Sequence, residues 1–244
     1  MRKHLKIGLV VPFATDRVPL EGPMMYPDVT FIPRGVGVRA LTPEGYDAAW
    51  DGILPAAKEL AKRGDLDAIM VIGTSLTFYR GYEAHQQLLE QLRKETGLPV
   101  STMTEAVVDG LRSVGAKRVA VATAYSDLVN ERLADFLRRA GFEVSAVQGF
   151  GIVEFGGAEK MTEQDIINLS GKVIGDAKAA DAVLISCGGL MTLGCAVPIE
   201  ERYGIPVVTS TQSAFWKALR LAGDNGQIKG YGRMLAQSDP VLVS

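Results

Sequence analysis

The sequence predicts an α/β protein with two pseudo-symmetric Rossmann-like lobes, each a parallel sheet flanked by helices, and an active site in the cleft between them. Three observations predict this fold. Short apolar runs typical of buried parallel strands alternate with helical patterns. The segment DAIMVIGTS at Asp67 recurs as DAVLISCGG at Asp181, and the matching runs TGLPV and YGIPV follow at Thr96 and Tyr203. Self-similarity of this length indicates two copies of one unit that face each other.

Composition sets limits on the class of protein. The 244 residues are 47% hydrophobic, which is enough for two compact lobes. With 26 basic and 28 acidic residues, the chain lacks the positive charge typical of nucleic-acid binding. No run approaches the ~20 apolar residues of a membrane span, and the basic N-terminus leads into a strand. We therefore expect a cytoplasmic monomer or small homo-oligomer without nucleic-acid or membrane partners.

The first predicted strand is Lys6 to Pro12, and it ends there because proline cannot donate to a continuing ladder. Residues 13–37 are rich in proline and glycine. They predict a long loop around one short strand, Val29 to Ile32. Within this loop, residues 24–26 (Met-Met-Tyr) either pack beneath it or line a pocket.

The next elements alternate helix and strand. A helix is predicted from Pro43 to about Arg63, with Thr42 as its N-cap. A strand follows at Ala68 to Ile72, and then a helix from about Thr77 to Thr96. That helix carries His85, which we expect to face solvent because no other metal-ligating residues accompany it.

The rest of the chain continues the alternation. Strands are predicted at 98–103, 118–123, 142–147, the run ending at Cys187, and 205–209, and helices at 104–114, 127–140, 162–177, 190–203 and 210–221. We expect Cys195, Phe215 and Trp216 in the core and the tail after Gly223 to be partly ordered at best. The expected division is residues 1–115 plus about 210–244 for the N-terminal lobe and 116–209 for the C-terminal lobe.

Cys187 is the candidate reactive group. It ends an apolar strand and is followed by Gly188 and Gly189, where a close backbone turn is possible. Ligands of open α/β sheets bind at the carboxyl ends of strands, so the thiol is predicted at a binding edge. The alternative is that Cys187 is a small buried hydrophobic residue. The glycine-rich loop 149–157 lacks a G-x-G-x-x-G pattern, so no dinucleotide is predicted, and no metal site or other cofactor is expected.

Two other strand ends carry hydrogen-bond donors. Thr74 and Ser75 follow Gly73, and their hydroxyls and backbone N–H groups suit a carboxylate or a developing oxyanion. They also suit a helix cap, and the two roles are compatible. Tyr125 lies at the end of another strand, where its phenol either donates to an oxyanion or fills the gap between strand and helix.

The repeat places Gly73 where the second copy has Cys187. Two thiols would exchange protons on opposite faces of a carbon, whereas here one face alone has an acid/base group. This arrangement favours a reaction that forms a carbanion by losing something other than a proton and then protonates it on one side.

Motifs over most of the chain resemble the arylmalonate decarboxylases, within the aspartate/glutamate racemase and maleate isomerase superfamily. These motifs are Val11-Pro12, TPEGYD at 42–47, GTSLTFYRG at 73–81, ATAY at 122–125, VNERL at 129–133, SCGGL at 186–190, Phe215-Trp216 and RLAG at 220–223. Racemases and maleate isomerases of the superfamily carry a first cysteine at the position of Gly73. The glycine therefore indicates the decarboxylase.

The resemblance implies cofactor-free decarboxylation of an α-aryl or α-alkenyl malonate, a small dicarboxylate, to a chiral monocarboxylic acid through an enediolate. It implies that one carboxylate is held by Thr74, Ser75, Tyr125 and backbone N–H groups near Ser75 and Gly188, and that Cys187 protonates the carbon. By the same resemblance, the departing carboxylate would lie in an apolar pocket lined by Val38, Leu41, Tyr46 and Leu76, with Pro12 forming part of the wall. Gly73 and Gly189 are also expected in the substrate site.

Some positions depart from the family pattern. Phe13 replaces a second proline and Arg39 replaces a small residue, so a bulky Phe13 or an inward Arg39 would reshape the pocket. The loop containing Phe155 and Ala158 matches poorly. The alternatives are a racemase or cis/trans isomerase of a small dicarboxylate, which would need a second base, and a small-acid binding protein without turnover.

Overall fold

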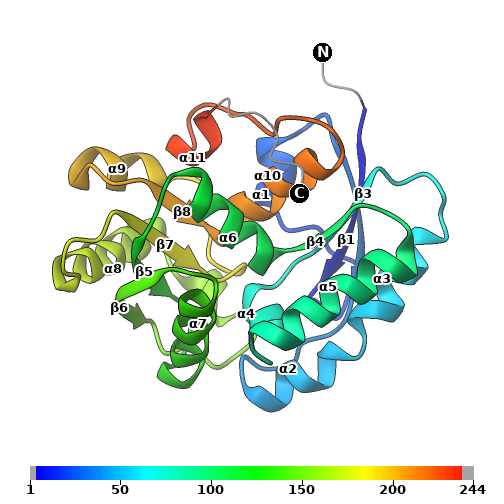
Figure 1. Ribbon diagram of the computed structural model, residues 1–244, viewed down its shortest axis with the longest axis horizontal. Helices are drawn as coiled ribbons and strands as arrows, with labels where there is room; N and C mark the ends of the chain where they lie inside the picture. Colours follow the sequence, from blue (N-terminus) through cyan, green and yellow to red (C-terminus); the bar gives the residue numbers. More distant parts are fainter. Residues whose placement is uncertain (1–3, 238–244) are drawn as a thin grey trace.

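Two four-stranded parallel sheets organise the protein. The computed structural model describes residues 4–237, and its sheets have the strand orders β2-β1-β3-β4 and β6-β5-β7-β8. The strands are β1 (Lys6–Val11), β2 (Thr30–Gly35), β3 (Ala68–Val71), β4 (Val100–Thr102), β5 (Arg118–Thr123), β6 (Glu143–Gly149), β7 (Ala182–Ser186) and β8 (Val207–Thr209). Figure 1 shows the sheets in separate lobes, each with helices packed around it. The predicted fold class is confirmed.

The helices occupy the connections between strands. They are α1 (Glu21–Met25), α2 (Pro43–Trp50), α3 (Ile53–Ala61), α4 (Thr74–Phe78), α5 (Tyr82–Thr96), α6 (Met103–Ser113), α7 (Asp127–Arg139), η1 (Gly157–Lys160), α8 (Glu163–Asp176), α9 (Ala196–Tyr203), α10 (Ser210–Leu221) and α11 (Arg233–Ala236). Thr42 caps α2 as predicted, because its side chain accepts a hydrogen bond from the Gly45 N–H. Thr162 forms a capping box with Asp165 at the start of α8.

The inner strands are buried apart from Lys6 and Arg118, the first residues of β1 and β5, as expected for parallel strands covered on both faces. Every residue of β3 and β7 is buried, and these strands pair with β1 and β5 respectively. The strand β2 lies at the edge of its sheet and accommodates Pro33, because an edge strand does not need that N–H.

Equivalent helices α6 and α10 pack against each other where the lobes meet (Figure 1). Each follows the fourth strand of its sheet order and is capped by the last threonine of that strand. Thr102 Oγ1 accepts from Glu105 N at 3.0 Å, and Thr209 Oγ1 accepts from Gln212 N at 3.3 Å. The internal repeat therefore extends to the capping chemistry.

The last long helix, α10, follows β8 but packs on α6, β3 and β4 as well. Its Phe215 ring contacts Phe31 of β2 edge-on, with centroids 4.9 Å apart, and a side chain at Gly22 of α1 would run into the same ring. These contacts support the proposal that the chain after residue 210 belongs with the N-terminal lobe.

Two long helices predicted from the sequence are interrupted. The helix expected from Pro43 to Arg63 is divided into α2 and α3 at Asp51 and Gly52. The helix expected from Thr77 begins earlier, at Thr74, and is divided at Gly81, whose φ of +92° is accessible mainly to glycine. The predictions were wrong there because apolar spacing continues across both breaks.

Three other segments differ from expectation. The long loop after β1 contains the short helix α1, and the helix predicted from Leu190 begins only at Ala196. The tail after Gly223 carries α11, with Met234 and Leu235 buried; residues 238–244 lie outside the described part. The tail is thus more ordered than we expected as far as Gln237.

His85 is buried, with 1% of its surface exposed, and does not face solvent as predicted. Its Nε2 lies 2.7 Å from Thr102 Oγ1, and its ring contacts Phe136 edge-on. Burial, with a smaller contribution from Arg93, lowers the pKa of His85 to about 4, so the ring is neutral near pH 7. Its role is to support the threonine that caps α6.

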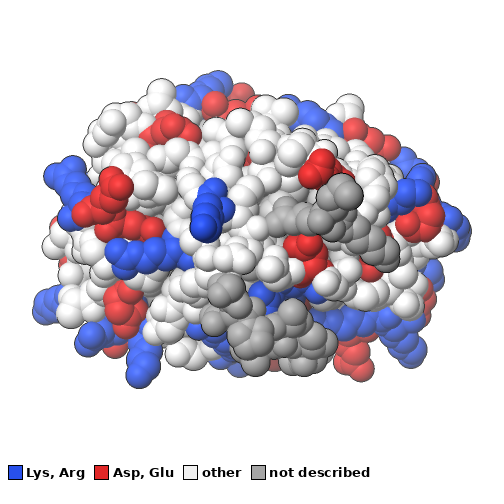
Figure 2. All heavy atoms as spheres, turned by 90° about the horizontal axis from the view of Figure 1, so that it is seen from above, with Lys and Arg blue, Asp and Glu red and all other residues white. Residues whose placement is uncertain are grey.

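The surface carries both charge signs. Figure 2 shows basic and acidic side chains interspersed over one face of the molecule. Between residues 4 and 237, no helix is long and apolar enough to cross a membrane.

Candidate active site

A pocket lies between the lobes at the carboxyl ends of β1, β3 and β7. The accessible volume of this pocket is about 50 Å³, so the pocket is narrow. Its lining comprises Pro12, Phe13, Pro19, Val38, Leu41, Tyr46, Ile72, Gly73, Thr74, Ser75, Leu76, Phe155, Gly156, Ala158, Glu159, Cys187, Gly188 and Gly189. The fold thus brings together all the predicted site residues except Tyr125, which lies behind the lining.

The N-terminal lobe contributes a glycine followed by two hydroxyls. Gly73 has φ +118°, a conformation that residues with a side chain rarely adopt, and a Cβ there would lie 3.2 Å from Leu76 Cβ. The turn at Gly73 starts α4 directly and places Thr74 and Ser75 on the pocket wall. Their side chains are 1% and 7% exposed, so any hydrogen bond they make to a ligand is shielded from water.

A buried chain of hydroxyl groups connects the lobes behind the pocket. Thr74 Oγ1 donates to Ser210 Oγ at 2.8 Å, and Ser210 Oγ donates to Ser186 Oγ at 3.3 Å. The chain ends with Tyr125, whose OH is 3.4 Å from Ser186 Oγ. The side chains come from α4, α10, β7 and the end of β5, so this network fixes the pocket wall across the lobe boundary.

Cys187 places a thiol on the wall of the pocket. It is 7% exposed, lines the pocket, and its Sγ accepts from the Gly189 N–H at 3.4 Å. Burial raises the pKa of the thiol to about 11, although the Gly189 N–H and the Tyr125 hydroxyl oppose this rise. The thiol is therefore protonated near pH 7, which suits it to give a proton.

Two tyrosines flank the thiol and stay neutral. Burial raises the pKa of Tyr125 well above its usual range, with a further contribution from Cys187, while Ser186 and Ser75 oppose the rise. Burial also raises the pKa of Tyr46, and Ser75 opposes it. Among the described residues the Tyr46 hydroxyl has no hydrogen-bond partner, so it is available to a ligand.

Several lining residues were not among the predicted site residues. Phe13 and Pro19 come from the loop after β1, while Phe155 and Glu159 come from the segment between β6 and α8. The sequence drew attention to Phe13 only as a departure from the family pattern and to Phe155 only through the poor match of its loop. It gave no signal for Pro19 or Glu159 as site residues. Arg39 is exposed and absent from the lining, so it does not point inward.

The second cysteine is separate from the pocket lining. Cys195 is fully buried, as predicted for a core residue, and burial raises the pKa of its thiol to about 12. Across residues 4–237, no group of three or more His, Cys, Asp or Glu side chains is placed to hold a metal ion.

The model of one protein family, arylmalonate decarboxylase, matches residues 7–235. The chain belongs to the arylmalonate decarboxylase family. It is 42% identical to the arylmalonate decarboxylase of Bordetella bronchiseptica over 95% of this chain and 97% of that protein. This membership makes the protein an enzyme.

Solved structures agree with that assignment. A glycine-to-cysteine, cysteine-to-serine double variant of arylmalonate decarboxylase in its liganded form has a TM-score of 0.93 and 40% identity, covering 96% of this chain and all of that one. The maleate isomerase of Geobacillus stearothermophilus is 26% identical over 97% of this chain and 99% of its own length. A maleate isomerase from Pseudomonas putida S16 shares the fold, with a TM-score of 0.88 at 21% identity over 97% of this chain and 99% of that one.

Proposed function

We propose that the enzyme decarboxylates an α-aryl or α-alkenyl malonate without a cofactor and gives a chiral monocarboxylic acid. The observation that carries this proposal is a single protonated thiol, Cys187, facing a pocket that also contains hydroxyl donors. Family membership supports the reaction class, and the small pocket supports a small substrate.

One carboxylate of the substrate is held by the hydroxyls of Thr74, Ser75 and Tyr125 and by the N–H groups of Ser75 and Gly188. The Thr74 hydroxyl donates to Ser210 Oγ in the free protein, so on binding it turns its proton to the carboxylate and accepts from Ser210 instead. The burial of these hydroxyls supports the assignment, because donors in a dry, preorganised site stabilise developing charge better than water does. Each well-placed donor contributes roughly 3 kcal/mol to the transition state.

The departing carboxylate lies against the apolar side of the pocket, formed by Val38, Leu41 and Leu76, with Pro12 beside them. A carboxylate is poorly solvated there, and its conversion to neutral CO₂ removes that cost. The bond between the α-carbon and this carboxylate breaks. Its electron pair stays on the α-carbon and spreads into the remaining carboxylate as an enediolate.

Cys187 then donates its S–H proton to the α-carbon. The thiolate that remains recovers a proton from solvent before the next turnover, so atoms and charge balance. Because the lobe opposite has Gly73 in the equivalent place, the proton arrives from one face and one enantiomer forms.

The alternatives make different demands. A racemase or cis/trans isomerase of a dicarboxylate requires a second acid/base group, and the raised pKa of Cys187 also disfavours the thiolate that such a reaction needs. A small-acid binding protein would have no use for the thiol.

The test is proton NMR of the purified enzyme with phenylmalonate in D₂O without added cofactor, metal or reductant, with maleate and aspartate in parallel. We expect CO₂ release and one deuterium at the α-carbon of phenylacetate. Unchanged phenylmalonate, together with conversion of maleate or α-deuteration of aspartate, would establish the isomerase or racemase instead.

A further inference from the structure

A second pocket adjoins the one that contains Cys187. Five residues line both, and these are Phe13, Pro19, Glu159, Gly188 and Gly189. The second pocket is larger than the first. Its accessible volume is about 260 Å³, against about 50 Å³ for the first pocket. A substituent on the α-carbon of a substrate therefore has space to extend past the two glycines.

The part of the second pocket that the first does not share contains an unusual polar pair. Glu21 Oε2 and Thr211 Oγ1 are buried and have no hydrogen-bond partner in the described chain, and their side chains are 3% and 1% exposed. Buried polar atoms in native proteins are nearly always paired, so two orphans on one cavity wall indicate a ligand that supplies the missing hydrogen bonds.

The other oxygen of Glu21 is already used. Oε1 accepts from Thr192 N at 2.6 Å and from Thr192 Oγ1 at 2.9 Å, which fixes the carboxyl group against the loop after β7. The Thr211 hydroxyl lies close enough to lower the pKa of Glu21, although the pair does not have hydrogen-bond geometry. The free oxygens of both side chains are thus held near each other in fixed positions.

Apolar groups surround this polar pair. Leu20, Leu190 and Met191 also line this pocket, and their apolar side chains suit an aromatic ring. The Arg17 charge is already paired, because Nη2 lies 2.5 Å from Glu159 Oε1, and the guanidinium stacks 4.0 Å from the centre of the Phe13 ring. Because Arg17 and Glu159 already pair with each other, we assign recognition of a polar group on the ligand to Glu21 and Thr211.

We infer that the second pocket selects α-aryl malonates whose ring carries a hydroxyl group, which hydrogen-bonds to Glu21 and Thr211. A phenol both donates and accepts, so it fits an ionised Glu21 as acceptor and a protonated Glu21 as donor. Burial raises the pKa of Glu21, and the hydrogen bonds from Thr192 oppose that rise. The inference rests on the proposed decarboxylation, because it assigns the substituent of the same substrate.

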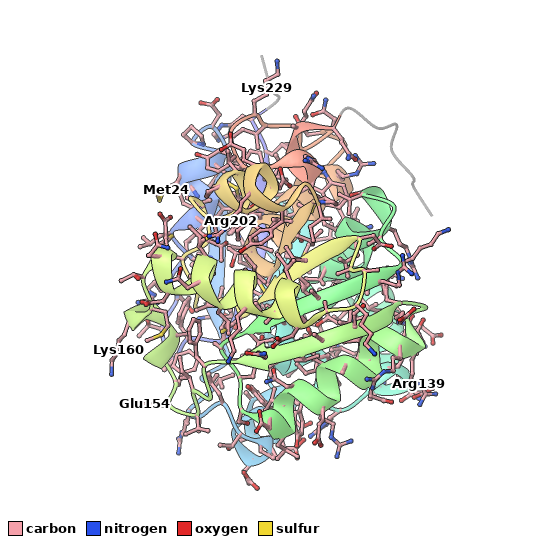
Figure 3. All side chains as sticks on the ribbon, turned by 90° about the vertical axis from the view of Figure 1, so that its left-hand side faces the viewer. Met24, Arg139, Glu154, Lys160, Arg202 and Lys229 are labelled. Carbon is pink, nitrogen blue, oxygen red and sulfur yellow. The ribbon has the colours of Figure 1, made fainter. Side chains whose placement is uncertain are left out.

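The ring would enter between the segment that carries α1 and the segment that carries η1. Figure 3 looks at the side of the molecule where both reach the surface, with Met24 marking α1 and Lys160 marking η1. The two pockets share Gly188 and Gly189, so a substituent that leaves the first pocket past these glycines enters the pocket that Glu21 lines.

The experiment compares kcat/KM for phenylmalonate and for its 3- and 4-hydroxyphenyl and 3- and 4-methylphenyl derivatives. We expect one hydroxyl isomer to exceed its methyl counterpart by about tenfold or more, the effect of one net hydrogen bond. Thr211→Val should abolish this preference while leaving phenylmalonate turnover within about twofold, and Thr211→Ser should keep it.

A melting curve separates recognition from damage to the fold. Because Thr211 Oγ1 has no partner, Thr211→Val should melt at the same temperature or higher. In Glu21→Gln the amide oxygen can still accept from Thr192, so the fold should persist while the hydroxyl preference changes.

Two failures are distinguishable. Turnover of phenylmalonate with equal rates for the hydroxyl and methyl derivatives, or a preference unchanged in Thr211→Val, would overturn the inference alone. Absence of turnover for every malonate would overturn the proposed function and this inference with it.

Discussion

The ends of β3 and β7 occupy equivalent places in the two sheets but carry different chemistry. Gly73, which has a positive φ, lies just beyond β3 and is followed by the hydroxyls of Thr74 and Ser75, whereas the thiol of Cys187 directly follows β7. Both ends face one pocket. The comparison teaches that the duplicated fold places two strand ends at one pocket, while single residues give them different properties. The residues after β3 are suited to holding charge, and the residue after β7 is suited to delivering a proton.

Removing the thiol tests the proton-delivering end and should have the largest effect. Cys187→Ala leaves the donors in place but removes the acid, so decarboxylation of phenylmalonate followed by NMR should slow by about 10²- to 10⁴-fold. Cys195→Ala is the matched control, because that thiol is buried away from the pocket lining. Equal rates for Cys187→Ala and the unmodified enzyme would refute the assignment.

Removing one hydroxyl tests the charge-holding end. Thr74→Val removes the Thr74 hydroxyl, and kcat should fall about 10²- to 10³-fold because the transition-state charge loses one proposed donor. Thr74→Ser keeps the hydroxyl and should retain most of the rate. A change in KM with kcat intact would mean that Thr74 binds substrate and transition state equally.

Making the two ends alike should change the stereochemistry. The substrate for this test is α-methyl-α-phenylmalonate, because its product, 2-phenylpropionate, is chiral. In Gly73→Cys a second thiol faces the opposite side of the carbon, so chiral chromatography should detect the opposite enantiomer. Gly73→Ala is the control for the backbone, because any side chain at φ +118° costs about 1–3 kcal/mol of stability. A single enantiomer from the cysteine variant, at the purity of the unmodified enzyme, would argue against protonation from these two positions.

The helix caps differ between the lobes in their sensitivity to pH. His85 supports Thr102, whereas the hydroxyl of Thr192 supports Thr209, at 3.2 Å. Because the folded pKa of His85 is lowered from 6.5 to about 4, its contribution is complete above pH 6.5 and is lost as pH falls towards 4, by up to about 3 kcal/mol.

Urea unfolding between pH 7.5 and 4.5 checks this expectation. His85→Gln should be less stable than the unmodified protein at pH 7.5, and its stability should vary less with pH. Parallel pH profiles for the two proteins would show that His85 does not titrate in this range.

Much of the fold could be predicted because the strands are continuous apolar runs and the repeat aligns them. The pocket residues next to strand ends, such as Thr74 and Cys187, followed from the same logic, since strand ends in parallel sheets converge. The placement of these residues around one pocket agrees with that expectation, and their catalytic roles remain a proposal.

The features that the sequence did not reveal depend on contacts between distant segments. Phe13 and Phe155 meet across the lobes, with ring centroids 6.1 Å apart, and no local pattern encodes that contact. His85 is polar on a largely polar helix, and only the distant Phe136 and Thr102 account for its burial. Helix breaks at Gly52 and Gly81 similarly depend on how the following helix packs.

The contact between Phe215 and Phe31 has a consequence for synthesis on the ribosome. The strand β2, which carries Phe31, emerges early, but α10, which carries Phe215, is translated about ten to forty seconds later at roughly 5–20 residues per second. During that interval the nascent chain exposes an apolar surface that chaperones recognise. Protease resistance of the first half of the polypeptide should therefore develop only once translation has passed α10.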